Sequence, residues 1–185
     1  MKAKVNKVTI EIIQGNLLDL PVNSVVNATD TNLNLSDLLI EKAGSDVQRI
    51  CREIGWCDVG SAVITSAGKL PFEKLIHTVG PRWGEGSERG KLANATLRSL
   101  KIAEENQLKS IAIPAISVGT FGYPLENCAV VMLNEIVDFT FENLKYLRKV
   151  MICLDSARAL KVFMDEFDRI IHELKSSGEG KVRAG

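Results

Sequence analysis

Two kinds of hydrophobic pattern alternate along this chain. Short apolar runs rich in β-branched residues are typical of buried strands, and they occupy residues 8–13, 24–28, 60–65, 74–79, 111–116 and 149–154. Between them, apolar residues recur every three or four positions, which is typical of helices with one apolar face; these stretches are 37–43, 46–54, 87–107, 124–141 and 157–174. Strands that alternate with helices predict an α/β fold, a three-layer α/β/α sandwich around a mixed, mostly parallel sheet of about six strands.

The length of 185 residues suits one domain with a full hydrophobic core. We therefore predict a single domain over residues 1–174. Residues 175–185 are mainly Ser, Gly, Glu and Lys, a composition that cannot bury much apolar surface, and we expect them to form a flexible C-terminal tail.

Composition and charge exclude several classes of protein. Hydrophobic residues make up 45% of the chain and charged residues 25%, as in a globular domain. Lys plus Arg and Asp plus Glu both number 23, so no overall positive field would attract DNA in general. No apolar run approaches the length of a membrane span, and no signal peptide opens the chain. The 4 cysteines are scattered and there are only 2 histidines, so we expect no disulfide framework, no metal site, no cofactor and a cytoplasmic location.

The stretch from Ser110 to Pro124 joins a strand to a helix through a loop of small residues. Gly119 and Gly122 give the loop backbone freedom, and Pro124 stands where a helix can begin. Strand, glycine-rich loop and helix N-terminus in this order direct backbone N–H groups at an anion, most often a phosphate. An ordinary strand-to-helix turn would use the same glycines. Phe121 favours the phosphate-binding interpretation, because an aromatic ring on such a loop can lie against a sugar or a base.

Four segments, in their order and spacing, resemble the signature segments of macrodomains. They are Gln14-Gly15-Asn16-Leu17, Val25-Val26-Asn27-Ala28, Leu75-Ile76-His77-Thr78-Val79-Gly80-Pro81-Arg82-Trp83, and the whole stretch from Ser110 to Pro124. One match would be weak, but the ordered set is specific and covers residues 8–172. The resemblance implies an α/β/α macrodomain that binds ADP-ribose or a derivative of it, free or attached to a protein, in a cleft at the carboxyl ends of the strands.

The resemblance also implies ligand contacts, position by position. Asn16, with Leu17 beside it, falls where an acidic residue usually receives the adenine amino group, and Asn27 falls where an asparagine orients the distal ribose. The residues that match the loop around the diphosphate are Ser117, Val118, Gly119, Thr120, Phe121 and Gly122, with Phe121 beside the distal ribose. A diphosphate requires many backbone donors, and a ribose requires an amide and an aromatic wall, so the chemistry of these residues agrees.

Two departures from the family pattern affect the site. Asn16 carries no charge, and a neutral hydrogen bond is about half as strong as one to an ionised group. The family's first loop usually reads Asn-Ala-Ala-Asn followed by glycines. Here Asn27-Ala28-Thr29-Asp30 is followed by a shorter loop without glycine, which is more similar to the macrodomain of the macro histone variant. The second asparagine is replaced by Asp30, and the catalytic aspartate of the efficient hydrolases falls on Ser36 or Asp37.

Three functions stay open at this point, of which binding of ADP-ribose is the first. A hydrolase would remove mono-ADP-ribose from proteins or deacylate O-acyl-ADP-ribose, with Asp30 or Asp37 as general base. In the alternative, Asp30 shapes an Asx-rich turn and Asp37 stabilises a helix N-terminus. The third function applies if Leu33 and Leu35, which stand where glycines are expected, block the diphosphate. The domain would then bind another nucleotide, RNA or a protein partner.

Two further residues lie in the third signature segment. His77 sits between Ile76 and Thr78 in an apolar strand, so we interpret it as a histidine of the core. Arg82 follows that strand and could contact a phosphate, but we interpret it as an exposed surface arginine.

Overall fold

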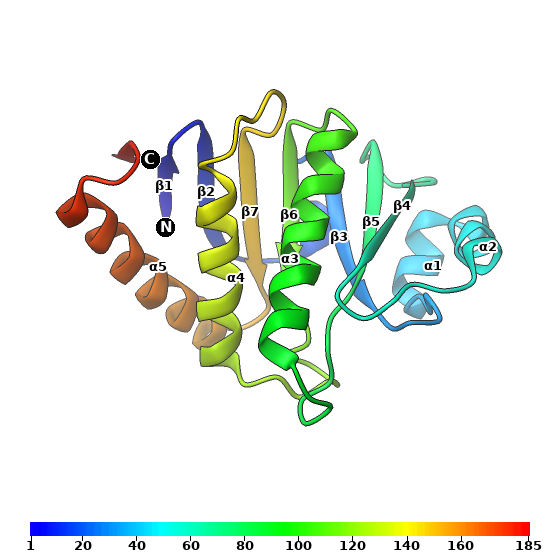
Figure 1. Ribbon diagram of the computed structural model, residues 1–185. Helices are drawn as coiled ribbons and strands as arrows, with labels where there is room; N and C mark the ends of the chain where they lie inside the picture. The colour runs from blue at the N-terminus through cyan, green and yellow to red at the C-terminus, as the bar shows by residue number, and fades with distance from the viewer.

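The computed structural model describes residues 1–185 and is built around an eight-stranded sheet (Figure 1). The strands are β1 Lys2–Val5, β2 Val8–Gln14, β3 Ser24–Thr29, β4 Ala62–Ser66, β5 Lys74–Val79, β6 Ser110–Pro114, β7 Lys149–Leu154 and β8 Val182–Ala184. The helices are the 3-10 helix η1 Leu17–Asp19, then α1 Asp37–Ala43, α2 Ser45–Ile54, α3 Glu88–Glu105, α4 Leu125–Phe139 and α5 Ala157–Ser177. Across the sheet the order is β4-β5-β3-β6-β7-β2-β1-β8.

The centre of the sheet is parallel and its edges are antiparallel. β2 pairs with β7, β7 with β6, β6 with β3 and β3 with β5, all in parallel register. β4 runs antiparallel to β5, and β1 runs antiparallel to both β2 and β8. The expected mixed, mostly parallel α/β sheet is therefore confirmed, with eight strands instead of about six.

The two additional strands lie at one edge of the sheet and are short. β1 reads Lys-Ala-Lys-Val and β8 reads Val-Arg-Ala, so neither contains the continuous apolar run by which the central strands were recognised. The C-terminal tail was expected to begin at Lys175, whereas α5 continues to Ser177 and the chain then returns to pair with β1. Gly178, with a φ of 73°, ends the helix by donating its N–H to the Leu174 carbonyl.

Helices cover both faces of the sheet, which gives three layers. α3, α4 and α5 lie side by side over one face, as Figure 1 shows in front of the strands. This face holds the larger hydrophobic core, which includes Phe163, Phe167 and Met132. α1 and α2 close part of the opposite face, where a smaller core contains Leu39 and Val47. The predicted α/β/α architecture is confirmed by these two cores.

Side-chain caps fix where two of the helices begin. Ser36 Oγ accepts the N–H of Leu39 at 3.2 Å at the start of α1, and Ser156 Oγ accepts the N–H of Ala159 at 3.1 Å at the start of α5. Both caps satisfy backbone donors that the first turn of a helix leaves free. No helix of the structure combines the length and the apolar character needed to cross a membrane.

We expect the larger core to carry most of the stability. Phe163 on α5 is fully buried, so Phe163→Ala should lower the free energy of unfolding by about 3–5 kcal/mol through lost burial and a cavity. Phe141→Ala is the matched control, because that side chain is 48% exposed and its loss should cost less than about 1 kcal/mol. Urea unfolding followed by circular dichroism measures both. Equal losses would contradict the assignment of the core.

Candidate functional site

Two adjoining cavities lie where the parallel strands end. The first measures about 430 Å³ and the second about 440 Å³. Ala115 and Gly119 line both cavities, so the loop that follows β6 separates two halves of one cleft. Ligands of parallel α/β sheets bind at this carboxyl edge, because there the loops between strands and helices converge.

The loop after β6 presents a run of free backbone donors. The N–H groups of Val118, Gly119, Thr120 and Phe121 donate to no backbone or side-chain acceptor of the protein. All four residues line the cleft, and Gly119 lies at its centre. Consecutive backbone N–H groups at the start of a helix make a concave site for an anion.

The loop keeps this shape because its two ends are fixed to one another and to α4. Ser117 adopts the left-handed region with a φ of 67°, and its carbonyl accepts the N–H of Tyr123 at 2.9 Å. The N–H of Gly122 donates to the carbonyl of Gly119 at 3.0 Å. Beneath the loop, Cys128 Sγ donates to the carbonyl of Ile116 at 3.3 Å. The donors are therefore preorganised before any ligand arrives.

Ser117 contributes a side-chain donor in addition to its backbone. Its hydroxyl is buried, it has no hydrogen-bond partner, and the residue lines the first cavity. Gly80, which follows β5, must be glycine, because a Cβ there would lie 2.2 Å from Ser117 Oγ and 2.5 Å from Ile116 Cγ2. A buried polar group without a partner is unfavourable, so the free Ser117 hydroxyl is suited to a ligand atom.

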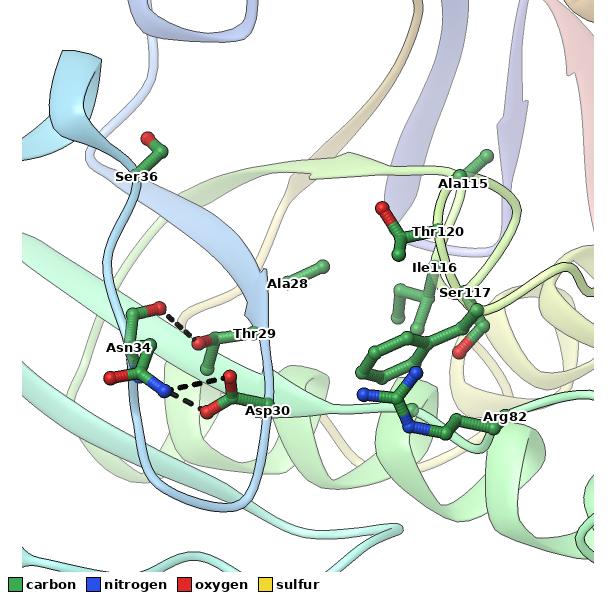
Figure 2. Close-up of a pocket in the computed structure, with 13 residues that line it drawn as sticks. Ala28, Thr29, Asp30, Asn34, Ser36, Arg82, Ala115, Ile116, Ser117 and Thr120 are labelled. Carbon is green, nitrogen blue, oxygen red and sulfur yellow. Dashed lines mark hydrogen bonds between the residues drawn. The ribbon is translucent and has the colours of Figure 1, made fainter.

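Arg82 brings a positive charge to the same cavity. Its guanidinium carbon lies 4.2 Å from the centroid of the Phe121 ring, which is a cation–π contact. The backbone between them is also tied, since the N–H of Trp83 donates to the Phe121 carbonyl at 2.8 Å. Arg82 and Asp30 are the only charged side chains that line the first cavity. Figure 2 shows Arg82 and Ser117 across the cavity from Asp30 and Asn34.

Asp30 organises the loop that follows β3. Its Oδ1 accepts the N–H groups of Asn32 at 3.0 Å and Asn34 at 3.2 Å, and its Oδ2 accepts Asn34 Nδ2 at 2.9 Å. Burial raises the pKa of Asp30, but the hydrogen bonds from Asn34 and Asn32 and the charge of Arg82 outweigh it, so the pKa lies below its ordinary value. The carboxylate is thus held ionised and both of its oxygens are engaged, as the Asx-turn interpretation predicted.

The leucines of this loop do not block the cleft. Leu33 is buried in the smaller core and Leu35 packs against that core, and neither residue lines either cavity of the cleft. Leu33 adopts a φ of 57°, a region that leucine rarely enters, and its burial offsets this strain. The loop therefore directs its apolar side chains away from the cavity and its polar ones toward it.

At the end of the same loop, Ser36 and Asp37 differ in their position relative to the cleft. Ser36 lines the first cavity and also caps α1. Asp37 is the first residue of α1 and lines neither cavity. The position of Asp37 matches the helix N-terminal role, in which a carboxylate interacts favourably with the helix dipole.

Asn27 belongs to a buried network beneath the cleft. Its side-chain amide nitrogen lies 3.1 Å from His77 Nδ1, and His77 Nε2 lies 2.8 Å from Thr65 Oγ1. Because an amide nitrogen only donates, Nδ1 accepts and Nε2 carries the proton that Thr65 Oγ1 accepts. Burial lowers the pKa of His77 to about 4, which keeps the ring neutral. His77 is thus a core histidine that holds the end of β3 through Asn27.

The second cavity is a mostly apolar slot between the ends of β2 and β7. Leu17, Val118 and Leu154 are among its walls. Only Asn16 and Asp155 line it with side-chain nitrogen or oxygen atoms. Asn16 also caps η1, since its Oδ1 accepts the N–H of Leu18 at 3.1 Å. A slot with apolar walls and polar groups at one end suits a planar heterocycle.

The structure gathers most, but not all, of the residues expected at the site. Those that line the cleft are Asn16, Leu17, Asp30, Ser117, Val118, Gly119, Thr120 and Phe121. Asn27, Asp37 and Gly122 do not line it, although Gly122 forms its turn with a φ of 73°. Arg82 is exposed, as expected, and it also lines the cleft. Asp155, which was not singled out, lines the second cavity. No group of three or more His, Cys, Asp and Glu side chains is placed to hold a metal ion.

The chain was compared with known proteins. The family model described as Macro domain matches residues 22–132. A Macro domain-containing protein of Caldanaerobacter subterraneus is 35% identical over 174 residues, which cover 89% of this chain and 98% of that protein. An O-acetyl-ADP-ribose deacetylase of Escherichia fergusonii is 36% identical over 159 residues, which cover 80% of this chain and 90% of that protein.

Solved structures show the same fold. The Oceanobacillus iheyensis macrodomain with ADP superposes with a TM-score of 0.87 at 29% identity and covers 94% of this chain and 97% of that chain. The Trypanosoma brucei macrodomain in complex with ADP-ribose gives a TM-score of 0.78 at 27% identity, covering 84% of this chain and 68% of that chain.

The buried His77 network predicts a specific loss of stability in acid. The unfolded chain binds the proton near the ordinary value of 6.5, whereas the folded protein binds it only near 4. The free energy of unfolding should therefore fall by about 1.4 kcal/mol per pH unit across this window, and this contribution levels off below it. Urea unfolding at a series of pH values measures the slope.

The matched variants are His77→Gln and His172→Gln. His77→Gln should remove this contribution from the slope, while His172→Gln should preserve it because His172 lies on the surface of α5. Carboxylates also titrate at the acid end, so the difference between the slopes of the two variants is the quantity that counts. Identical slopes would contradict the role of His77.

Proposed function

Because this chain belongs to the macrodomain family, we propose that its cleft binds ADP-ribose, free or attached to a protein. The observation that carries the proposal is the run of unpartnered N–H groups from Val118 to Phe121 at the centre of the cleft. The diphosphate is the only part of ADP-ribose that needs many donors at one point, and this loop supplies them. The complexes of relatives with ADP and ADP-ribose support the same ligand.

The different linings of the two cavities set the direction in which ADP-ribose would lie in the cleft. The slot between Leu17 and Leu154 would hold the base, and the polar first cavity would hold the distal ribose. There the ribose would lie beside Phe121, with Arg82 and the Ser117 hydroxyl close to the diphosphate. In this proposal Asn27 acts through His77 as a positioning residue for the first loop and makes no direct contact with the ligand.

The partner of the domain follows from the same site. Protein-linked ADP-ribose is the form we favour, since the first cavity, where the distal ribose would lie, is open to solvent. A cytoplasmic location remains part of the proposal and rests on the four free cysteines. RNA or another protein partner is the alternative if ADP-ribose does not bind.

Titration calorimetry with ADP-ribose, run beside ADP, tests the binding proposal. We expect a dissociation constant of about micromolar or tighter, and a loss of about a hundredfold or more in Gly119→Glu. The new carboxylate would stand among the donors and repel the diphosphate. The fold should tolerate it, because no atom lies within 4 Å of a Cβ at Gly119 and its φ is not positive.

Gly90→Glu is the control, because Gly90 on α3 also has no atom within 4 Å of an added Cβ and lines neither cavity. It should bind as the wild type does, and thermal melting should show all three proteins folded. Absence of any heat of binding at about millimolar ADP-ribose would contradict the proposal. Equal weakening of ADP-ribose binding in both variants would show that the loop is not part of the binding site.

Hydrolysis is the second candidate, and the relative named O-acetyl-ADP-ribose deacetylase favours it. Of the two carboxylates considered, only Asp30 lines the cavity. A general base must accept a proton from water, and its strength falls as its pKa falls. Asp30 has a lowered pKa and both of its oxygens accept hydrogen bonds, so we propose that it shapes the loop and that the domain binds its ligand without efficient turnover.

Turnover of O-acetyl-ADP-ribose separates the two candidates. We expect Asp37→Asn to change any acetate release by less than about threefold, and Asp30→Asn to change it only as far as it weakens binding, because neither carboxylate serves as a base. General base catalysis contributes about 10²–10⁴-fold. A fall of that size in Asp30→Asn, with Asp37→Asn unaffected, would establish a hydrolase. Binding of ADP-ribose to each variant, measured in parallel, shows whether the cleft remains intact.

A further inference from the structure

A further cavity lies outside the cleft, between the N-terminal turns of α3 and α4. It measures about 390 Å³, and we call it the α3–α4 groove. Trp83 and Tyr123 both line it, with their ring centroids 5.1 Å apart at an interplanar angle of 68°. Tyr123 is buried, whereas Trp83 is 50% exposed. An exposed tryptophan at the edge of a groove is a common anchor for a binding partner.

The α3–α4 groove and the first cavity lie on two sides of the same pair of loop segments. Arg82 lines the first cavity, and the next residue, Trp83, lines the groove. In the same way Phe121 lines the first cavity and Tyr123 lines the groove. The N–H of Trp83 donates to the Phe121 carbonyl at 2.8 Å and joins the two segments. Cα atoms two residues apart are separated by about 7 Å at most, so a chain attached to a ligand in the first cavity reaches the groove within a few residues.

The charged side chains that line the groove leave one cation unpaired. Glu88 Oε1 accepts two backbone N–H groups of the loop before α3, at 2.9 and 3.1 Å. Glu126 Oε1 accepts Arg158 Nη2 at 2.9 Å. Arg89 also lines the groove, and it belongs to none of the ion pairs of the protein. The charge that the groove offers to a partner is therefore positive.

The position of Arg89 is unfavourable for its own helix. It is the second residue of α3, where a cation opposes the helix dipole. Neither an ion pair nor the helix dipole thus accounts for this arginine, whereas an anionic group on a partner would. Tryptophan and arginine are also among the residue types that most often carry the binding energy of protein interfaces.

We propose that the α3–α4 groove binds an acidic peptide segment next to the ADP-ribosylated residue of a partner protein. The inference rests on the proposed function, because ADP-ribose in the cleft brings the attached chain to the groove. Trp83 packs against an apolar side chain of the segment, and Arg89 pairs with a carboxylate. A short tether raises the effective concentration of the segment at the groove, so contacts too weak to hold a free peptide still add to the affinity.

Titration calorimetry with two short peptides and free ADP-ribose tests the inference. Each peptide contains a leucine and carries one ADP-ribose on its central residue through a nonhydrolysable linkage. The other flanking residues are glutamates in one peptide and glutamines in the other. The wild type should bind the glutamate peptide about threefold or more tighter than the glutamine peptide, because only glutamate pairs with Arg89.

Arg89→Ala should bring the ratio of the two peptide affinities close to one. Arg52→Ala is the matched control, because Arg52 is an exposed arginine of α2 that also belongs to no ion pair. It should keep the wild-type ratio. Free ADP-ribose should bind both variants within about twofold of the wild type, since neither arginine lines the cleft.

The aromatic contact has its own pair of variants. Trp83→Ala should weaken both peptides by about threefold or more relative to free ADP-ribose, because the apolar contact is lost. Trp56→Ala is the control, since Trp56 is 56% exposed and lines neither the cleft nor the groove. It should leave the affinities for all three ligands unchanged. Thermal melting checks that every variant is folded.

Two results would overturn the inference while leaving the proposed function in place. The first is a wild-type preference for the glutamate peptide below about threefold, and the second is the same preference in Arg89→Ala as in Arg52→Ala. If the wild type binds neither free ADP-ribose nor either peptide, the proposed function fails and the inference fails with it. Free ADP-ribose thus reports on the cleft, and the two peptides report on the groove.

Discussion

The cleft depends on a stretch of backbone that keeps its N–H groups free. Backbone donors in a folded protein are almost always paired, so a run of free ones must be held by its surroundings. Here the positive φ of Ser117, the turn closed by Gly122 and the anchoring of Ile116 to Cys128 supply that support. The larger core beneath α4 fixes these anchors. Fold stability and ligand recognition are therefore linked through one loop.

A second layer of support lies on the opposite side of the cleft. Asn27 and His77 join β3 to β5, and Thr65 extends the network to β4. Since a neutral, fully bonded histidine tolerates burial, the network holds the end of β3 without placing a charge under the ligand site. The loop that follows is then shaped by Asp30, whose carboxylate binds three donors of its own loop. These hydrogen bonds give the side chains a positioning task, which is the role we propose for them.

Local chemistry in the sequence was enough to predict the central strands of the sheet and the loop from Ser117 to Gly122. Each of these depends on residues close together in the chain. The side of β3 that Asn27 faces was not predictable, because it depends on the register with β5. Arg82 is exposed, as expected, but its contact with Phe121 was not predictable, since that contact joins two loops distant in sequence. Short edge strands such as β8 carry too few apolar residues to be recognised.

The two ends of the cleft impose different demands on the same backbone. In the proposed complex, main-chain atoms recognise the diphosphate, so most side chains there could change without altering the donors. In the second cavity, Asn16 and Asp155 alone bring side-chain nitrogen or oxygen, so a single substitution there changes the polar groups offered to a base. A macrodomain can therefore retain its affinity for a nucleotide diphosphate while its preference among bases shifts. In this chain the cap on η1 takes up the Asn16 oxygen, so the amide at this end of the cleft also has a structural task.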